Sequence, residues 1–204
     1  MSDIGYIIGN GRSRQQFDLS RLRTTFGKGL VIGCNALYRD WYKDWSLPDY
    51  LVAIDEKIIN EINKSDYPKD RFIVPPEHEQ YEPAEYNPMQ PRSNAGMNAM
   101  QEAIRKGCNT LYCLGFDFLI ADAEQSTSNV YEGTNAYGPE THASYTDSIN
   151  RTGYLGYFAR KNPSVDFYFV FPHTTKDLHP VDATNVRGLY YADFEDLLEK
   201  KAAV

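Results

Sequence analysis

The sequence predicts one α/β domain with a Rossmann-like, doubly wound and mostly parallel sheet that carries helices on both faces. Short, almost continuous apolar runs recur along the chain, as in strands that are buried on both faces. Segments with the apolar spacing of helices separate these runs, which is the order of βαβ units. The length of 204 residues is that of a single domain, so we assign residues 1–204 to one unit.

The predicted elements follow from the pattern of apolar residues. Apolar runs predict strands over residues 4–8, 30–37, 50–54, 71–74, 110–118 and 165–171. Apolar side chains with helical spacing predict helices over residues 56–64, 93–106, 145–161 and 194–201. The first strand stops at Gly9-Asn10-Gly11 and the fourth at Pro75-Pro76, because glycine and proline break regular structure.

Two stretches show no period. Residues 75–91 contain five prolines and are predicted to form a loop. Residues 119–141 are rich in Ser, Thr, Asn and Gly, and we expect them to be structureless. A stretch of this length in a small domain is usually a lid or a binding loop. We therefore predict that residues 119–141 form a lid over a site.

Composition limits the classes of function. With 21 Lys and Arg against 28 Asp and Glu, the net charge is −7, and we expect no nucleic-acid partner. The three cysteines lie outside any CxxC or Cys/His cluster, so we expect neither a disulfide scaffold nor a zinc site. We expect no membrane span and no signal peptide, and hence a cytoplasmic protein. Association into a homo-oligomer is compatible with these properties.

The glycine-rich segment after the first strand is the first candidate site. In a parallel sheet ligands bind at the carboxyl ends of the strands, where Gly9, Asn10, Gly11 and Ser13 are expected to lie. Two glycines allow close approach of a ligand, and exposed amides can hold a phosphate. The segment is neither GxGxxG nor a Walker A loop, so a tight strand exit without a ligand explains it equally well.

Asn35 and Asp55 are expected at the ends of the second and third strands. The amide of Asn35 suits the edge of a base or a sugar hydroxyl, but asparagine is also a common turn residue. Asp55 could bind a ribose hydroxyl or a metal, and it could equally be the N-cap of the helix that begins at Glu56.

Three further positions complete the candidate set. Asn94, Ala95 and Gly96 open the second predicted helix, and a helix N-terminus with small residues can bind an anion or simply be capped. Asp117 ends the most apolar strand, where carboxylates commonly serve sites. His142 follows the predicted lid, where it could act as a base at neutral pH or be an ordinary surface histidine.

Taken in order, several segments resemble the bacterial sialyltransferases of glycosyltransferase family 42. The motif IIGNGRS and the DLSRL that follows it are similar to the opening segment of that family. The other similar segments are CNALY, RSNAG, LGFDF and the stretch from His142 to Thr146-Asp147, which cover residues 34–38, 92–96, 114–118 and 142–147. The resemblance extends to about residue 172.

The resemblance implies a transferase that moves a sugar, with inversion, from a CMP-activated donor to a hydroxyl group of a glycan or another acceptor. The nucleotide sugar is then a substrate, and no further cofactor is expected. The family's pattern puts Gly9, Asn10, Gly11 and Ser13 around the phosphate and ribose, Asn35 on the ribose or base, and Asn94 with Gly96 on the base side. It makes His142 the base that takes the acceptor's proton.

The departures from the family leave two alternatives. Leu119 stands where the family has a tyrosine that assists the departing phosphate, and Tyr131 or Tyr137 in the lid could replace it. The third strand resembles that of archaeal-type 6-hydroxymethylpterin pyrophosphokinases, which implies ATP and Mg²⁺ held by Asp55 and Asp117. The second alternative is a nucleotide-binding protein without catalysis, which the missing tyrosine favours.

Overall fold

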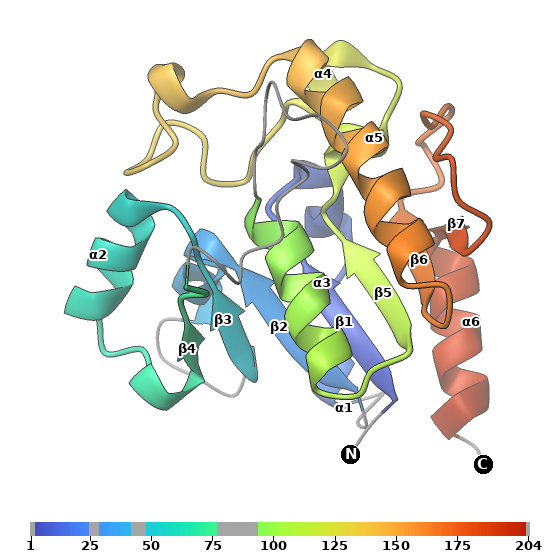
Figure 1. Ribbon diagram of the computed structural model, residues 1–204, viewed down its shortest axis with the longest axis horizontal. Coiled ribbons are helices and arrows are strands. Elements are labelled where there is room, and N and C mark those ends of the chain that lie inside the picture. Colours follow the sequence, from blue (N-terminus) through green and yellow to red (C-terminus); the bar gives the residue numbers. More distant parts are fainter. Residues whose placement is uncertain (1–2, 25–28, 42–47, 77–93, 203–204) are drawn as a thin grey trace.

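A single sheet of parallel strands forms the centre of the molecule (Figure 1). The computed structural model describes residues 3–24, 29–41, 48–76 and 94–202. The strand order is β4-β3-β2-β1-β5-β6-β7. The strands are β1 Ile4–Ile8, β2 Leu30–Cys34, β3 Tyr50–Val52, β4 Phe72–Ile73, β5 Thr110–Leu114, β6 Asp166–Phe171 and β7 Val186–Tyr190. The predicted doubly wound α/β fold is confirmed.

The order of the strands reverses between β1 and β5. β1 pairs with β2 on one side and with β5 on the other. From β1 the chain builds one half of the sheet outward to β4, returns to the centre at β5, and builds the other half outward to β7. Open α/β sheets bind ligands in the crevice at such a reversal, outside the carboxyl ends of the strands.

Helices cover both faces of the sheet, with α3 and α5 on one face and α6 on the other (Figure 1). Because side chains alternate along a strand, Ile7 of β1 packs into the core with α3 and α5, whereas Tyr6 and Ile8 pack into the core that contains Phe194 of α6. The helices are α1 Arg21–Thr24, α2 Glu56–Lys64, α3 Ala95–Arg105, α4 Ala123–Ser126, α5 Tyr145–Lys161 and α6 Tyr191–Ala202. Short 3-10 helices are η1 Arg12–Gln16, η2 Asn35–Trp41, η3 Lys69–Arg71, η6 Asp117–Leu119 and η7 Pro139–Thr141.

The structure corrects some element bounds. The second strand ends at Cys34 rather than at residue 37, because Asn35 adopts a φ of 51° and turns the chain into η2. The fifth strand ends at Leu114 rather than at residue 118, because Gly115 adopts a φ of 76°. The edge strand β7 was not expected from the sequence, since its mixed composition does not form an apolar run.

Residues 119–141 are more ordered than expected. They contain α4 and η7, and the side chains of Tyr131 and Ala136 are buried. The expectation of a structureless stretch is therefore wrong, because this segment contributes its own side chains to the core. The predicted loop at residues 75–91 lies mostly outside the described residues. Within the described part of the chain, no helix is long and apolar enough to cross a membrane.

Candidate functional site

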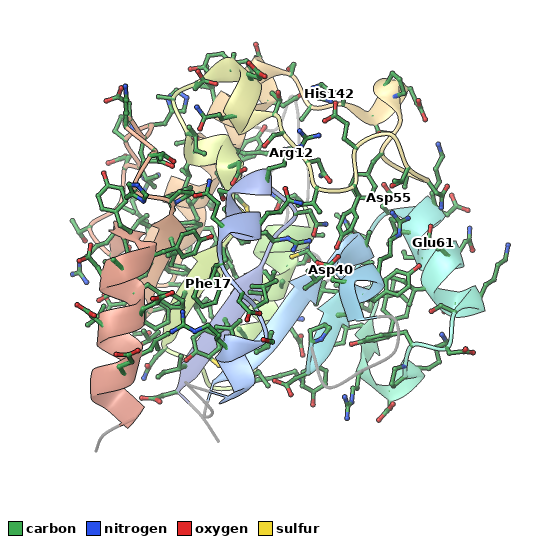
Figure 2. All side chains as sticks on the ribbon, turned by 180° about the vertical axis from the view of Figure 1, so that it is seen from behind. Arg12, Phe17, Asp40, Asp55, Glu61 and His142 are labelled. Carbon is green, nitrogen blue, oxygen red and sulfur yellow. The ribbon has the colours of Figure 1, made fainter. Side chains whose placement is uncertain are left out.

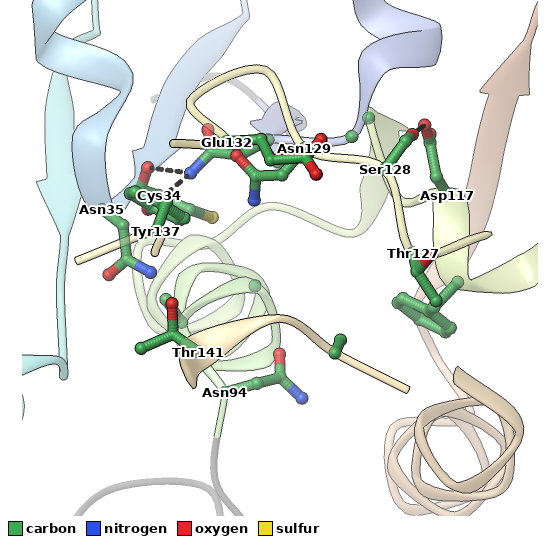
Figure 3. A pocket seen from close by; sticks show the side chains of 18 of the residues that line it. Cys34, Asn35, Asn94, Asp117, Thr127, Ser128, Asn129, Glu132, Tyr137 and Thr141 are labelled. Atoms are coloured by element: carbon green, nitrogen blue, oxygen red, sulfur yellow. Dashed lines mark hydrogen bonds between the residues drawn. The ribbon is translucent and has the colours of Figure 1, made fainter. Parts of the chain in front are cut away.

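A cavity of about 260 Å³ lies at the reversal between β1 and β5 (Figure 3). Its lining comes from the carboxyl ends of β1, β2 and β5, from the first turn of α3, and from parts of residues 126–143. We call residues 9–13 and 115–117 the floor, and residues 126–143 the roof. The cavity thus lies where the fold class places ligands.

Most of the residues that the sequence singled out line this cavity. They are Gly9, Asn10, Gly11, Asn35, Asp55, Asn94, Ala95, Gly96, Asp117, Tyr137 and His142. Two candidates lie outside its lining. Ser13 lines a neighbouring hollow. Tyr131 belongs to the roof, but its side chain is buried in the core.

The glycines of the floor allow the backbones at the ends of β1 and β5 to lie close together. The amide of Gly9 donates to Leu114 O at 2.8 Å, and that of Gly11 donates to Gly115 O at 2.9 Å. A Cβ atom on Gly9 would lie 2.6 Å from Gly115 O, a distance that real Cβ atoms do not reach. These two amides are therefore engaged within the protein, which supports the interpretation of this segment as a tight strand exit.

Asp117 braces the floor against the roof. Its carboxylate accepts hydrogen bonds from the amide of Ser13 at 3.0 Å, from the hydroxyl of Ser13, and from the hydroxyl of Ser128 at 3.2 Å. Burial raises the pKa of Asp117, and the hydrogen bonds from Ser13 and Ser128 act in the opposite direction. The arrangement gives Asp117 a structural role and explains why a carboxylate ends β5.

Two asparagines line the cavity with orientations that the backbone determines. Because a carbonyl can only accept, Nδ2 of Asn10 is the atom that donates to Cys34 O, at 3.1 Å. This leaves Oδ1 of Asn10 buried without a partner among the described residues. Oδ1 of Asn94 accepts from Met97 N at 2.9 Å as the N-cap of α3, and this leaves its Nδ2 buried and unpaired in the same sense. The cavity therefore has an unpaired acceptor, Oδ1 of Asn10, on its floor and an unpaired donor, Nδ2 of Asn94, at the start of α3.

Asn35 combines both interpretations that the sequence allowed. Its φ of 51° lies in the left-handed region, which asparagine tolerates better than most residues, so it is a turn residue. It also lines the cavity, and its Oδ1 is buried with no hydrogen-bond partner in the described structure. A buried polar atom without a partner is unfavourable by roughly 1–3 kcal/mol, which a bound ligand or an ordered water can relieve.

Asp55 is the N-cap of α2. Its Oδ1 accepts from the amide of Lys57 at 3.0 Å. This is the capping role that the sequence suggested, and Asp55 lines the cavity as well. Among the described residues, no group of three or more His, Cys, Asp or Glu side chains is arranged to hold a metal ion.

The roof is held down by arginines. Arg14 donates to Asp40 at 2.8 Å and to the hydroxyl of Tyr131 at 2.9 Å, and the same hydroxyl donates to Asp40 at 2.7 Å. Arg39 binds Glu61 at 2.6 and 2.7 Å and also donates to Thr134 Oγ1 at 2.8 Å. The hydroxyl of Tyr131 is thus engaged with two partners beneath the roof.

Tyr137 is the roof tyrosine that reaches the cavity. Its hydroxyl accepts from Nδ2 of Asn10 at 3.3 Å (Figure 3). Burial raises the pKa of Tyr137 to about 12, so its hydroxyl keeps its proton at neutral pH. Of the two tyrosines that the sequence offered as substitutes at position 119, the structure places Tyr137 in the lining of the cavity.

His142 lies at the outer end of the roof, on the same side of the molecule as Arg12 (Figure 2). Its Nδ1 is 3.9 Å from Oε1 of Glu132, and Oε2 of Glu132 accepts from Arg12 at 2.9 Å. The side chain of His142 is 44% exposed, so a bound molecule or water can reach it. Through Glu132, the roof is thus joined to Arg12, which follows β1.

Sequence reasoning missed several residues of the lining. They are Ser126, Thr127, Ser128, Asn129, Glu132, Ala136, Thr141 and Arg151. The polar composition of residues 119–141 was the available signal, but it marked the whole segment rather than single positions. Comparisons with known proteins add nothing further, because no family model, no curated protein and no solved structure matches this chain.

Proposed function

We propose that the cavity binds a cytidine nucleotide and that the protein is a glycosyltransferase that uses a CMP-activated sugar. The observation that carries the proposal is the pattern of hydrogen-bonding groups in the lining. Asn10 and Asn35 each offer a buried, unpaired amide oxygen, and Asn94 offers an unpaired amide N–H beside the first turn of an 11-residue helix. A nucleotide presents donors at one end and an anion at the other, which matches this pattern.

The start of α3 is the best position for the phosphate. The amides of Gly9 and Gly11 are engaged with β5 and the amide of Ser13 with Asp117, so they do not form the phosphate cradle that the sequence suggested. Ala95 and Gly96 open α3 and line the cavity, where the positive end of the helix dipole favours an anion. The oxygens of Asn10 and Asn35 are then left for ribose hydroxyls and the amino group of cytosine.

The charges of the lining favour one phosphate over three. Asp55 and Glu132 add carboxylates to the cavity, and Arg151 adds a guanidinium. A triphosphate would bring several more negative charges close to these carboxylates, which is unfavourable without a cation. The side-chain oxygens of Asp55 and Asp117 accept bonds from Lys57 N, Ser13 and Ser128, which supports a nucleoside monophosphate over ATP with Mg²⁺.

The proposed transfer uses His142 and Tyr137. The acceptor hydroxyl loses its proton to His142, and its oxygen forms the new bond to the sugar carbon. The bond between that carbon and the phosphate oxygen breaks, and the electron pair leaves on CMP. Tyr137, protonated at neutral pH, donates a hydrogen bond to the departing phosphate. The roof excludes water and so limits hydrolysis of the donor.

The second candidate function is a nucleotide-binding protein without catalysis. The side chain of Leu119 is buried in the core with α3 and α5, so it offers no polar group to a departing phosphate. If Tyr137 does not substitute, the site binds a nucleotide but does not turn it over.

A thermal-shift panel tests the nucleotide. CMP, at about a hundred times its dissociation constant, should stabilise the fold by roughly 2.7 kcal/mol. CMP should raise the melting temperature of the parent more than ATP does, in the presence or absence of Mg²⁺. A response to ATP with Mg²⁺ and none to CMP would support the pyrophosphokinase alternative. The variant Asn35→Gly keeps the left-handed backbone without strain, and it should weaken the response to CMP while unfolding as the parent does.

A transfer assay run four ways tests the mechanism: parent and His142→Ala, each with and without EDTA. Loss of a general base lowers turnover by about 10²–10⁴-fold, and CMP binding should be unchanged. Turnover in the parent should persist in EDTA. Turnover that EDTA abolishes contradicts the mechanism, and full activity of His142→Ala removes the histidine from its role. Tight CMP binding without turnover on any donor supports the second candidate.

A further inference from the structure

The floor contains the one Asn-Gly dipeptide of the sequence, Asn10-Gly11. In such a dipeptide the backbone nitrogen of the glycine can attack the side-chain carbonyl carbon of the asparagine, because glycine has no Cβ that shields its nitrogen. A five-membered succinimide ring forms, and the side-chain nitrogen leaves as ammonia. Water then opens the ring to aspartate, or to isoaspartate, in which the backbone runs through the former side chain. Asn10 therefore combines a place in the cavity with chemical lability.

The structure requires both residues of this dipeptide. A Cβ atom on Gly11 would clash with the carboxylate of Asp117, which is buried and hydrogen-bonded in place. Nδ2 of Asn10 donates to Cys34 O at 3.1 Å and to the hydroxyl of Tyr137 at 3.3 Å. An ionised aspartate has no proton to donate at this position. The fold therefore keeps a labile dipeptide at its floor, because neither residue can be exchanged without the loss of these contacts.

The folded protein restrains the two groups that must react. The amide of Gly11 donates to Gly115 O, which directly follows β5, at 2.9 Å. The side chain of Asn10 donates to Cys34 O, at the end of β2. Because β5 and β2 pair with opposite sides of β1, the amide and the side chain are held toward different neighbours. The nitrogen of Gly11 must also lose its proton before it attacks, and the hydrogen bond to Gly115 O favours the protonated amide.

Either product of the reaction damages the floor. Isoaspartate adds one backbone atom between Gly9 and Gly11, whose amides donate to Leu114 O and Gly115 O at 2.8 and 2.9 Å. A segment that is hydrogen-bonded on both sides of the insertion cannot take up an extra atom without breaking one of these bonds. Aspartate keeps the backbone but turns a carboxylate oxygen toward Cys34 O, and two acceptors without a proton between them repel each other.

We propose that Asn10-Gly11 is a self-modification site that the floor controls. It is protected in the folded protein, and it converts to aspartate and isoaspartate while the floor is open. Because buried strands separate only when the sheet opens, conversion takes place in the unfolded chain, which then cannot return to the parent structure. The fraction of chain that is unfolded therefore sets the lifetime of the cavity. The reaction consumes one water and releases one ammonia, and it is independent of any ligand of the cavity.

Mass spectrometry of proteolytic peptides tests the proposal on the full chain, incubated at neutral pH in urea at concentrations that span the unfolding transition. Conversion of Asn10 should be at least about a hundredfold slower in buffer than in the unfolded chain, and its rate should rise in proportion to the unfolded fraction. Equal rates in buffer and in urea would overturn the protection. Absence of conversion in urea would overturn the modification, and conversion in buffer beyond what the unfolded fraction explains would overturn the link to the sheet.

A pair of matched variants tests the damage. Asn10→Asp reproduces one product and should lower the melting temperature by about 5 °C or more, because the donor to Cys34 O is lost. The control is Asn129→Asp, since Asn129 uses its Oδ1 to accept from the amide of Tyr131 at 2.9 Å and aspartate keeps that acceptor. Its melting temperature should stay close to that of the parent. Parent chain converted in urea, separated by ion exchange through its added negative charge and refolded, should melt lower than unconverted chain treated alike. Melting temperatures equal to the parent in Asn10→Asp and in the converted chain would overturn the damage to the floor.

Discussion

The floor of the cavity is held mainly by backbone atoms, whereas the roof is held mainly by side chains that reach it from distant parts of the chain, together with the backbone bond from Val130 N to Asn10 O at 2.8 Å. At the floor, Gly9 and Gly11 donate directly to the end of β5. At the roof, the bond from Arg12 to Asn129 O joins positions 117 residues apart, and Arg39 reaches Thr134 across 95 residues. The two surfaces enclose one space, but they are built differently.

This difference predicts two levels of stability. Backbone contacts between buried strands open only when the sheet itself opens, so the floor should share the stability of the whole domain. Side-chain contacts around Arg39 are partly exposed and can break without disturbing the sheet. A ligand could therefore enter by local opening of the roof while the floor stays in place.

The largest effect is expected at the floor, from Gly9→Ala. The new Cβ would lie 2.6 Å from Gly115 O, a backbone atom that directly follows the central strand β5 and has little room to move aside. We expect a loss of about 3 kcal/mol in the free energy of unfolding, measured by urea denaturation. The control is Gly156→Ala in α5, where the nearest atom is 3.3 Å away and alanine favours the helix. Equal losses in both variants would contradict the account of the floor.

The next effect is expected at the roof, from Arg39→Leu. Loss of the bonds to Glu61 and Thr134 should lower the unfolding free energy by about 1–2 kcal/mol. Hydrogen exchange should quicken at the amides of Val130 and Gly133 and stay slow at the floor amide of Gly9.

The matched control for Arg39→Leu is Arg187→Leu. Arg187 also pairs with a carboxylate, that of Asp166, but both side chains are about half exposed, so this change should have little effect. Faster exchange at the floor and the roof together in Arg39→Leu would show that the two surfaces open as one unit.

The sequence predicted the floor better than the roof for a physical reason. A strand, the glycine or polar residue that ends it and the next turn are consecutive residues, so local patterns place Gly9, Gly11 and Asp117 at one edge of a parallel sheet. The partners of the roof, such as Arg14 and Tyr131, are 117 residues apart, and no local pattern pairs them.

The sequence left the role of the floor glycines open and did not predict β7. The glycines of the floor suit a phosphate loop and a tight strand contact equally, and the structure shows that their amides bind β5. β7 was missed because it is an edge strand whose residues are only half-buried or exposed, so its sequence lacks an apolar run. The glycine pattern was real, but its tertiary neighbours decide what it does, whereas β7 offered no pattern to interpret.

Low pH should weaken the contacts that hold the roof, because Glu61 accepts hydrogen bonds from Arg39 and from Asn135 of the roof. Burial alone would raise the pKa of Glu61, but hydrogen bonds from Arg39, Asn135 and Tyr38 outweigh it and bring the pKa to about 2. A lowered pKa stabilises the fold above the pKa of the unfolded carboxyl, near 4.3, and this stabilisation is lost as the pH falls toward 2. The difference in unfolding free energy between the parent and Glu61→Gln should be constant above about pH 5 and shrink below pH 4. A constant difference down to about pH 2 would contradict this role.

The smallest effect is expected from Ala136→Gly in the roof. Ala136 adopts a φ of 67°, a left-handed conformation that is unfavourable for alanine by about 1 kcal/mol. Glycine removes this strain but has a larger entropy in the unfolded chain, by roughly 0.4–1 kcal/mol, so the two effects nearly cancel. We expect the unfolding free energies of the parent and of Ala136→Gly to lie within about 0.5 kcal/mol of each other in thermal and urea denaturation.

By contrast, Ala123→Gly at the start of α4 relieves no strain and should destabilise the protein by about 0.4–1 kcal/mol through the larger entropy of the unfolded chain. A similar loss at both positions would mean that Ala136 is unstrained.

The most direct test of the proposed nucleotide site is calorimetric titration of CMP into Asn94→Asp. Aspartate keeps the cap on Met97 N, so α3 should still begin at Ala95, but the unpaired N–H of Asn94 becomes a carboxylate oxygen. We expect CMP to bind at least about tenfold more weakly than to the parent, or about 1.4 kcal/mol, while cytidine, which has no phosphate, binds both proteins alike. Unchanged CMP affinity in a folded Asn94→Asp protein would contradict the placement of the nucleotide's phosphate at the start of α3.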